Sequence, residues 1–214
     1  MTTSIKESKI NINMKDYTIN EIENQMANLG YKFFTQGDYN VNTIAVRSAS
    51  NFDGSNVKNL FLDKLYCIYK INDEWISRDY KVTTVPGLAY FKTPYNAAYG
   101  TAILKPGQYS GCYQLGYHYS YPALVQTGIV SCYRDQNMDS VIDMNPATVQ
   151  SGYYGINIHY SMDNSITIDR WSAGCTVLNT GPNSQKYYQF LWNYQNSIAK
   201  GFKNSFTYTL IDEF

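Results

Sequence analysis

The stretch Leu65–Ile71, LYCIYKI, joins isoleucine and tyrosine side chains that favour extended backbone. Comparable short apolar runs recur between residues 31 and 169, and Gly, Pro, Asn and Asp separate them. These runs are Tyr80–Thr84, Leu88–Phe91, Gly100–Leu104, Ala123–Tyr133 and Gly155–Tyr160. Such a density of short runs and turn residues predicts a mainly β fold, arranged as a sheet or barrel.

An amphipathic helix is predicted before this β-rich region. Thr18 and Glu21 have the spacing of a capping box, in which each side chain accepts a backbone N–H at the start of the helix. One helical face then carries Ile19, Ile22, Met26 and Leu29. Gly30 provides a stop, so we expect a helix over residues 19–29.

A second helix and a closing strand are predicted near the C-terminus. The helix spans about residues 185–200 and ends before Gly201. Its expected buried face is Tyr188, Leu191, Trp192, Gln195 and Ile198. Residues 206–211 alternate as a strand does. The fold class expected is therefore β-rich α+β, with residues 1–50 as a helical or extended segment that can form a small lobe and residues 51–214 as the main domain.

Composition excludes several classes of partner. The chain has 214 residues, 44% of them hydrophobic, and its 17 basic and 17 acidic residues balance to zero net charge. We therefore expect neither nucleic-acid binding nor electrostatic attraction to an anionic membrane. No apolar run approaches the roughly 20 residues that span a bilayer, so membrane insertion is not expected. Residues 1–14 lack the apolar core of a signal peptide, which predicts synthesis in a bacterial cytoplasm without export.

Residues 172–178, SAGCTVL, carry the strongest chemical signal. Cys175 follows Gly174, which lets the backbone bend close to a substrate carbonyl. The N–H groups of both residues are candidate donors to an oxyanion, and the thiol is a candidate nucleophile. The other cysteines, Cys67, Cys112 and Cys132, have no zinc-binding spacing and are interpreted as small apolar residues.

A histidine on an alternating strand is the candidate base. His159 ends the run Gly155–His159, and if Ile156 and Ile158 face the core, Asn157 and His159 face the other, open side. An imidazolium beside Cys175 would lower the thiol pKa. Ser172, Asn157, Asp169 or a backbone carbonyl would hold the imidazole in its tautomer.

His159 followed by Ser172, Gly174 and Cys175 resembles the signature of the L,D-transpeptidase catalytic domain. In that family a strand histidine precedes a Ser-His-Gly-Cys motif whose cysteine attacks an amide of a peptidoglycan stem peptide. The resemblance implies a β-sandwich or half-barrel with peripheral helices, catalytic roles for these four residues, and no cofactor. The chain departs from the pattern at Ala173, at Tyr160 and at Val177, where the family has His, Gly and a substrate-binding Arg.

A longer stretch, residues 100–178, resembles a variant branch of the family found in bacteriophages and Bacteroidetes-type genomes. The matching segments are Gly100–Tyr109, Pro122–Gln126, Tyr133–Asp135, Gly155–His159 and Trp171–Cys175. Alanine before Gly-Cys is normal in that branch. The resemblance implies a phage-type cell-wall hydrolase that reaches peptidoglycan after lysis or within a virion. The alternative is a structural or wall-binding virion component that keeps the fold without catalysis.

Further residues are weaker candidates. His118, Asn157, Tyr160 and Trp171 are candidates for substrate binding, although His118 is also explained as a turn histidine among tyrosines. Oxygen-bearing side chains alternate at Asp135, Asn137, Asp139 and Asp143, as at the start of a calcium loop. The loop lacks the glycine and glutamate expected later in that motif, and a solvated loop with Asx turns explains it equally well. No metal is therefore expected.

Overall fold

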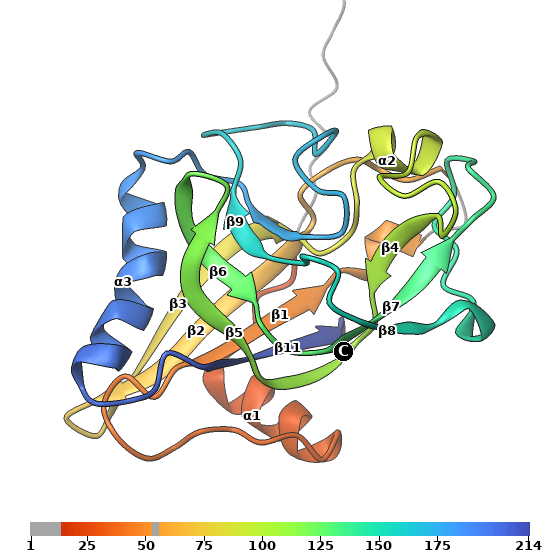
Figure 1. The fold of residues 1–214 in the computed structure, drawn as a ribbon. Coiled ribbons are helices and arrows are strands. Elements are labelled where there is room, and N and C mark those ends of the chain that lie inside the picture. The colour runs from red at the N-terminus through yellow and green to blue at the C-terminus, as the bar shows by residue number, and fades with distance from the viewer. Residues whose placement is uncertain (1–13, 53–55) are drawn as a thin grey trace, which may run out of the picture.

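A computed structural model describes residues 14–52 and 56–214. Eight strands form a closed barrel in the order β1-β11-β5-β6-β9-β10-β3-β2 (Figure 1). Their bounds are β1 Asn42–Arg47, β2 Asp63–Ile71, β3 Glu74–Thr83, β5 Gly107–His118, β6 Tyr121–Gln126, β9 Ile158–Tyr160, β10 Thr176–Leu178 and β11 Phe206–Asp212. The predicted β-rich class is confirmed.

A smaller sheet lies beside the barrel. It has the order β4-β7-β8, with β4 at Thr101–Leu104, β7 at Val130–Asp135 and β8 at Gln150–Gly152. The predicted run 123–133 is thus two strands, β6 in the barrel and β7 in the second sheet. The chain passes from one sheet to the other at Gly128, whose N–H donates to the Cys112 carbonyl. A Cβ at this position would lie 2.5 Å from the Cys112 sulfur, so the close approach requires glycine.

Helix α1, Ile19–Asn28, has the predicted capping box, with Thr18 and Glu21 bonded reciprocally. Ile22 and Met26 are its buried residues, and they pack on one side of β1 and β2, beneath the barrel in Figure 1. Strand β1 is buried along its whole length and pairs with β2 and, in parallel, with β11. Residues 42–47 are therefore part of the barrel and not of a separate lobe.

Helix α3, Gln185–Ala199, begins at its N-cap Ser184 and lies along another side of the barrel (Figure 1). The predicted buried face is wrong, because Tyr188, Trp192 and Ile198 are exposed. Its buried residues are Tyr187, Phe190, Leu191, Asn193, Tyr194 and Ser197. Apolar side chains occur on both faces of this helix, so periodicity alone does not choose between them. The polar Asn193 is accommodated by hydrogen bonds with the Tyr69 and Tyr80 hydroxyls.

The run Leu88–Phe91 is also not the predicted strand, since it lies in the short helix α2, Leu88–Lys92. Asn59 accepts the Leu88 N–H through its side-chain oxygen, and Phe91 packs in a small apolar cluster with Val57 and Ile103. Two 3₁₀ turns complete the fold, η1 at Ala49–Phe52 and η2 at Pro146–Thr148. None of the helices in the described ranges is long and apolar enough to cross a membrane. The stretch that lacks the pattern of a signal peptide is residues 1–14, and residues 1–13 of it lie outside the described residues.

Candidate functional site

Cys175 lies on a sharp turn immediately before β10. The buried Ser172 hydroxyl donates to the Cys175 carbonyl at 2.7 Å and accepts the Gly174 N–H at 3.2 Å. Gly174 has φ +139°, and a Cβ there would lie 2.8 Å from the Ala102 carbonyl oxygen. Glycine is therefore required at this position by backbone conformation and by close packing against β4.

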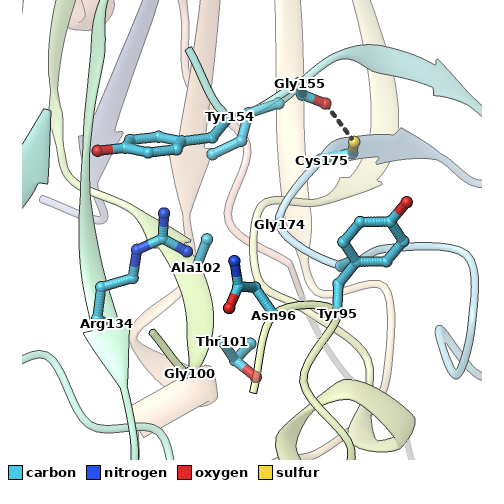
Figure 2. Close-up of a pocket in the computed structure, with 12 residues that line it drawn as sticks. Tyr95, Asn96, Gly100, Thr101, Ala102, Arg134, Tyr154, Gly155, Gly174 and Cys175 are labelled. Atoms are coloured by element: carbon cyan, nitrogen blue, oxygen red, sulfur yellow. Dashed lines mark hydrogen bonds between the residues drawn. The ribbon is translucent and has the colours of Figure 1, made fainter. Parts of the chain in front are cut away.

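The Cys175 thiol contacts the chain segment that leads into β9. The Asn157 N–H donates to the sulfur at 3.4 Å. The thiol donates to the Gly155 carbonyl at 3.5 Å, the contact that Figure 2 shows as a dashed line. Although the residue is partly exposed, burial of the sulfur raises the thiol pKa to about 11, and the Asn157 N–H offsets only part of that shift. The free protein thus holds a protonated thiol.

Two hollows share the wall in which Cys175 lies. We call the first the arginine pocket, about 190 Å³, and the second the histidine pocket, about 500 Å³. Both are lined by Tyr95, Tyr154, Gly155, Ala173 and Cys175. The arginine pocket adds Asn96, Thr101, Ala102, Arg134, Ile156 and Gly174 among others (Figure 2). The histidine pocket adds His118, Tyr121, Asn157, His159, Arg170 and Trp171 among others. A ligand that spans both pockets passes the thiol.

His159 lines the histidine pocket but is not on an open face as predicted, since it is only 3% exposed. Strand β9 is covered on both sides, so alternation with Ile158 does not expose the imidazole. Its Nδ1 lies 2.8 Å from the Tyr160 carbonyl, which makes Nδ1 the protonated nitrogen and leaves Nε2 as a base. Burial lowers the His159 pKa to about 4, so the imidazole is neutral near pH 7 and the expected thiolate–imidazolium pair is absent from the free protein.

The strand register sets the distance between His159 and Cys175. Strands β9 and β10 are parallel, with His159 opposite Val177, and the Asn157 carbonyl accepts the Thr176 N–H. Asn157 is therefore the immediate neighbour of Cys175, and His159 lies two residue pairs further along, level with Val177. Within the described chain no hydrogen bond joins the imidazole to the thiol.

His118, at the end of β5, stacks on His159 with ring centroids 4.6 Å apart. Its Nδ1 lies 2.8 Å from the Asn157 side-chain nitrogen, and Tyr119 and Tyr121 contact the ring edge-on. Burial lowers the His118 pKa as well. The residue is thus both packed among tyrosines and part of the pocket, so the two interpretations offered by the sequence are compatible.

The predicted supporting residues have different roles from those expected. Ser172 shapes the Cys175 turn, Asn157 holds His118, and Asp169 bonds Asn59 and Thr167, so none of them orients His159. The Tyr160 carbonyl orients the imidazole, which is the backbone-carbonyl alternative that the sequence left open. The Gly174 N–H is already bonded to Ser172 and is not free for an oxyanion, whereas the Cys175 N–H makes no hydrogen bond to a described residue.

Of the other predicted substrate contacts, Trp171 lines the histidine pocket, whereas Tyr160 packs against Tyr121 and Tyr187. Arg134 lies in the segment Tyr133–Asp135, which matches the variant branch, but the sequence pattern indicates no role for it. An isolated arginine at a strand end gives no pattern from which its place in a pocket can be inferred.

Gln126, in the matching segment Pro122–Gln126, likewise has no role that the sequence pattern indicates. Its side-chain oxygen accepts the N–H groups of Tyr154 and Ile156, and its amide nitrogen donates to the carbonyls of Gly128 and Gly152. Gln126 therefore holds the segment that carries the Gly155 carbonyl beside the thiol.

The candidate calcium loop uses its oxygens internally. Asp135 accepts the Asp143 N–H, Asp139 accepts the Val141 N–H, and the Asn137 side chain donates to Asp143. The bond from the Val141 N–H to Asp139 is an Asx turn, as is the one from the Asp139 N–H to the Asn137 side-chain oxygen, in keeping with the alternative interpretation. Burial, with the charges of Asp143 and Asp139, raises the Asp135 pKa to about 6. Over residues 14–52 and 56–214, no three His, Cys, Asp or Glu side chains are grouped as metal ligands.

No protein-family model, curated protein or solved structure matches this chain. The resemblance to the L,D-transpeptidase family therefore depends on the quoted residues alone.

Proposed function

We propose that this protein is a cysteine-nucleophile acyl-transfer enzyme acting on peptidoglycan stem peptides. The observation that carries the proposal is the place of Cys175, in the wall common to two pockets, with the His159 and His118 rings lining one of them. The order of His159 and then Cys175 in the chain is that of the L,D-transpeptidase family. Its bacteriophage-like branch favours a cell-wall hydrolase.

The reaction starts from neutral groups. A substrate amide carbonyl meets the sulfur, His159 Nε2 takes the thiol proton as the S–C bond forms, and the Cys175 N–H is available to the oxyanion. The imidazolium then gives that proton to the leaving amine as the C–N bond breaks. Water then attacks the thioester carbonyl and gives a proton to His159, the C–S bond breaks to release the acyl half as a carboxylic acid, and the imidazolium returns the proton to the Cys175 thiolate. If a stem-peptide amine attacks instead, the product is a cross-link.

The substrate sets where the enzyme must act. Peptidoglycan lies outside the cytoplasm, and the bacteriophage-like resemblance favours access through lysis or as part of a virion. A short tetrapeptide stem is also a substrate for an L,D-carboxypeptidase reaction, which uses the same thioester and releases one amino acid.

Incubation with purified muropeptides, read by mass spectrometry, tests the proposal. Shortened stems indicate hydrolysis and dimers indicate transpeptidation. We expect Cys175→Ser and His159→Ala each to reduce the rate by at least about a hundredfold, the usual lower range for a positioned acid–base group. Cys112→Ser is the matched control, because Cys112 is a partly exposed free cysteine that lines neither pocket. His118→Ala should have a smaller effect, mainly on KM.

A second candidate is a non-catalytic structural or wall-binding component of a virion. The high pKa of Cys175 and the lack of an imidazole–thiol hydrogen bond favour it. Muropeptides that stay unchanged at high protein concentration, while still binding the protein, would support this second candidate over the enzyme.

A further inference from the structure

Arg134, near the end of β7, turns its guanidinium into the arginine pocket (Figure 2). The residue is 8% exposed, so its charge is largely removed from bulk water. Two contacts fix the group: Nε donates to the Gln150 side-chain oxygen at 3.2 Å, and the guanidinium carbon lies 4.4 Å from the centre of the Tyr154 ring. Such a placement restricts the side chain to one orientation.

The charge has no anionic partner in the described chain. No described carboxylate lies within 4.0 Å of the guanidinium, and its two terminal nitrogens make no hydrogen bond to a described residue. Among the residues that line the pocket, Arg134 is the one with a formal charge. Buried charges are normally paired, so an unpaired guanidinium facing a cavity points to an anionic ligand.

A second donor faces the same space. The Asn96 side-chain oxygen accepts the Ala98 N–H, which directs the amide NH₂ of Asn96 into the pocket, opposite Tyr154 (Figure 2). Its nitrogen makes no hydrogen bond to a described residue. A planar guanidinium together with an amide NH₂ matches the two oxygens of a carboxylate.

We propose that the arginine pocket binds a carboxylate carried by the acyl half of the substrate, with Arg134 as its partner. The assignment to the acyl half rests on the proposed function. His159 must protonate the leaving amine, so that amine faces the histidine pocket, and the acyl half extends past Cys175 in the opposite direction. The substrate class is then an amide whose acyl residue bears a free carboxylate close to the bond that is cut.

A matched pair of peptides tests this inference without catalysis. The probes are N-acetyl-L-alanyl-γ-D-glutamyl-L-lysine amide, with a free α-carboxylate on the acyl side, and its isoglutaminyl counterpart, with a carboxamide there. Both are titrated calorimetrically into the Cys175→Ala protein. We expect the acid to bind at least about tenfold more tightly, as for one charge-assisted bidentate contact.

Substitutions assign that preference to one residue. Adding Arg134→Gln should weaken the acid to the affinity of the carboxamide, and Arg134→Lys should retain only part of the preference because it keeps the charge without the planar fork. Lys105→Gln removes the same charge from an exposed residue that lines neither pocket and should leave the ratio unchanged.

Equal binding of the two peptides, a preference that survives Arg134→Gln, or failure of both peptides to bind at millimolar concentration would overturn the inference. Failure of the proposed function is a separate result. A clear acid preference in the Cys175→Ala protein, with no turnover by the unmodified protein, would leave the carboxylate site standing and remove the catalytic proposal.

Discussion

Replacement of Ser172 by alanine tests whether this residue builds the site or takes part in its chemistry. The hydroxyl is fully buried and bridges the Gly174 N–H and the Cys175 carbonyl. Ser172→Ala removes both hydrogen bonds, and at about 0.5–1.5 kcal/mol each the loss is about 1–3 kcal/mol of unfolding free energy. For a domain of this size a loss of about 2 kcal/mol lowers Tm by about 4–8 °C.

The assay is urea unfolding, in which the midpoint should fall while the slope m stays constant. Ser110→Ala is the matched control, since Ser110 is exposed and its side chain makes no hydrogen bond to a described residue, so its change should stay within about 0.5 kcal/mol. Activity should fall with stability because the turn holds Cys175. If Ser172→Ala were as stable as the control, the bridging role would be refuted, and a loss of activity with full stability would place the hydroxyl in the reaction itself.

Three further predictions follow from the same turn and the adjacent strand. Gly174→Ala should destabilise the fold by about 1–3 kcal/mol in the urea assay, because its Cβ meets the Ala102 carbonyl at a φ that favours glycine, and a neutral result would contradict the described turn. Burial lowers the His159 pKa from 6.5 to about 4 in the folded state. Between pH 6.5 and 4 the unfolded state therefore binds a proton at residue 159, whereas the folded state does not bind one. Stability should therefore fall as the pH falls through this window, by up to about 3 kcal/mol, and His159→Gln should remove that part of the slope measured by urea titrations at several pH values. The rate of Cys175 alkylation by iodoacetamide, followed by peptide mass spectrometry, should rise about tenfold per pH unit from pH 7 to 9 because the thiol pKa is about 11, and rapid alkylation at pH 6 would contradict that pKa.

The elements that the sequence predicts correctly are those in which a local rule determines the structure. The Thr18–Glu21 capping box begins α1, and Leu65–Ile71 falls within β2. Closure of the barrel was not predictable in this way, because it depends on β1 pairing with β11, whose residues are more than 160 positions away. The run Leu88–Phe91 shows the same limit, since four apolar residues fit a strand or one helical turn until their neighbours are known.

The same division applies to the candidate site: features set by neighbouring residues could be predicted from the sequence, and features set by distant residues could not. Cys175 and His159 do line one pocket, and Gly174 has the unusual backbone that its position before the cysteine suggested. Burial of His159 was missed because alternation along a strand assumes one solvated face, and β9 has none. Arg134 was missed because it comes from the second sheet, which the sequence pattern did not distinguish from the barrel.

The neutral state of the site constrains its mechanism. A thiol of pKa about 11 and an imidazole of pKa about 4 disfavour a preformed ion pair, so proton transfer has to accompany attack on the substrate. That requirement gives the substrate a second role. If the proposed function holds, a substrate in both pockets would also have to let the His159 ring and the sulfur come within hydrogen-bonding distance. Reaction would then depend on the bound substrate, because the thiol of the free protein is protonated and bonds only the Asn157 N–H and the Gly155 carbonyl among the described residues.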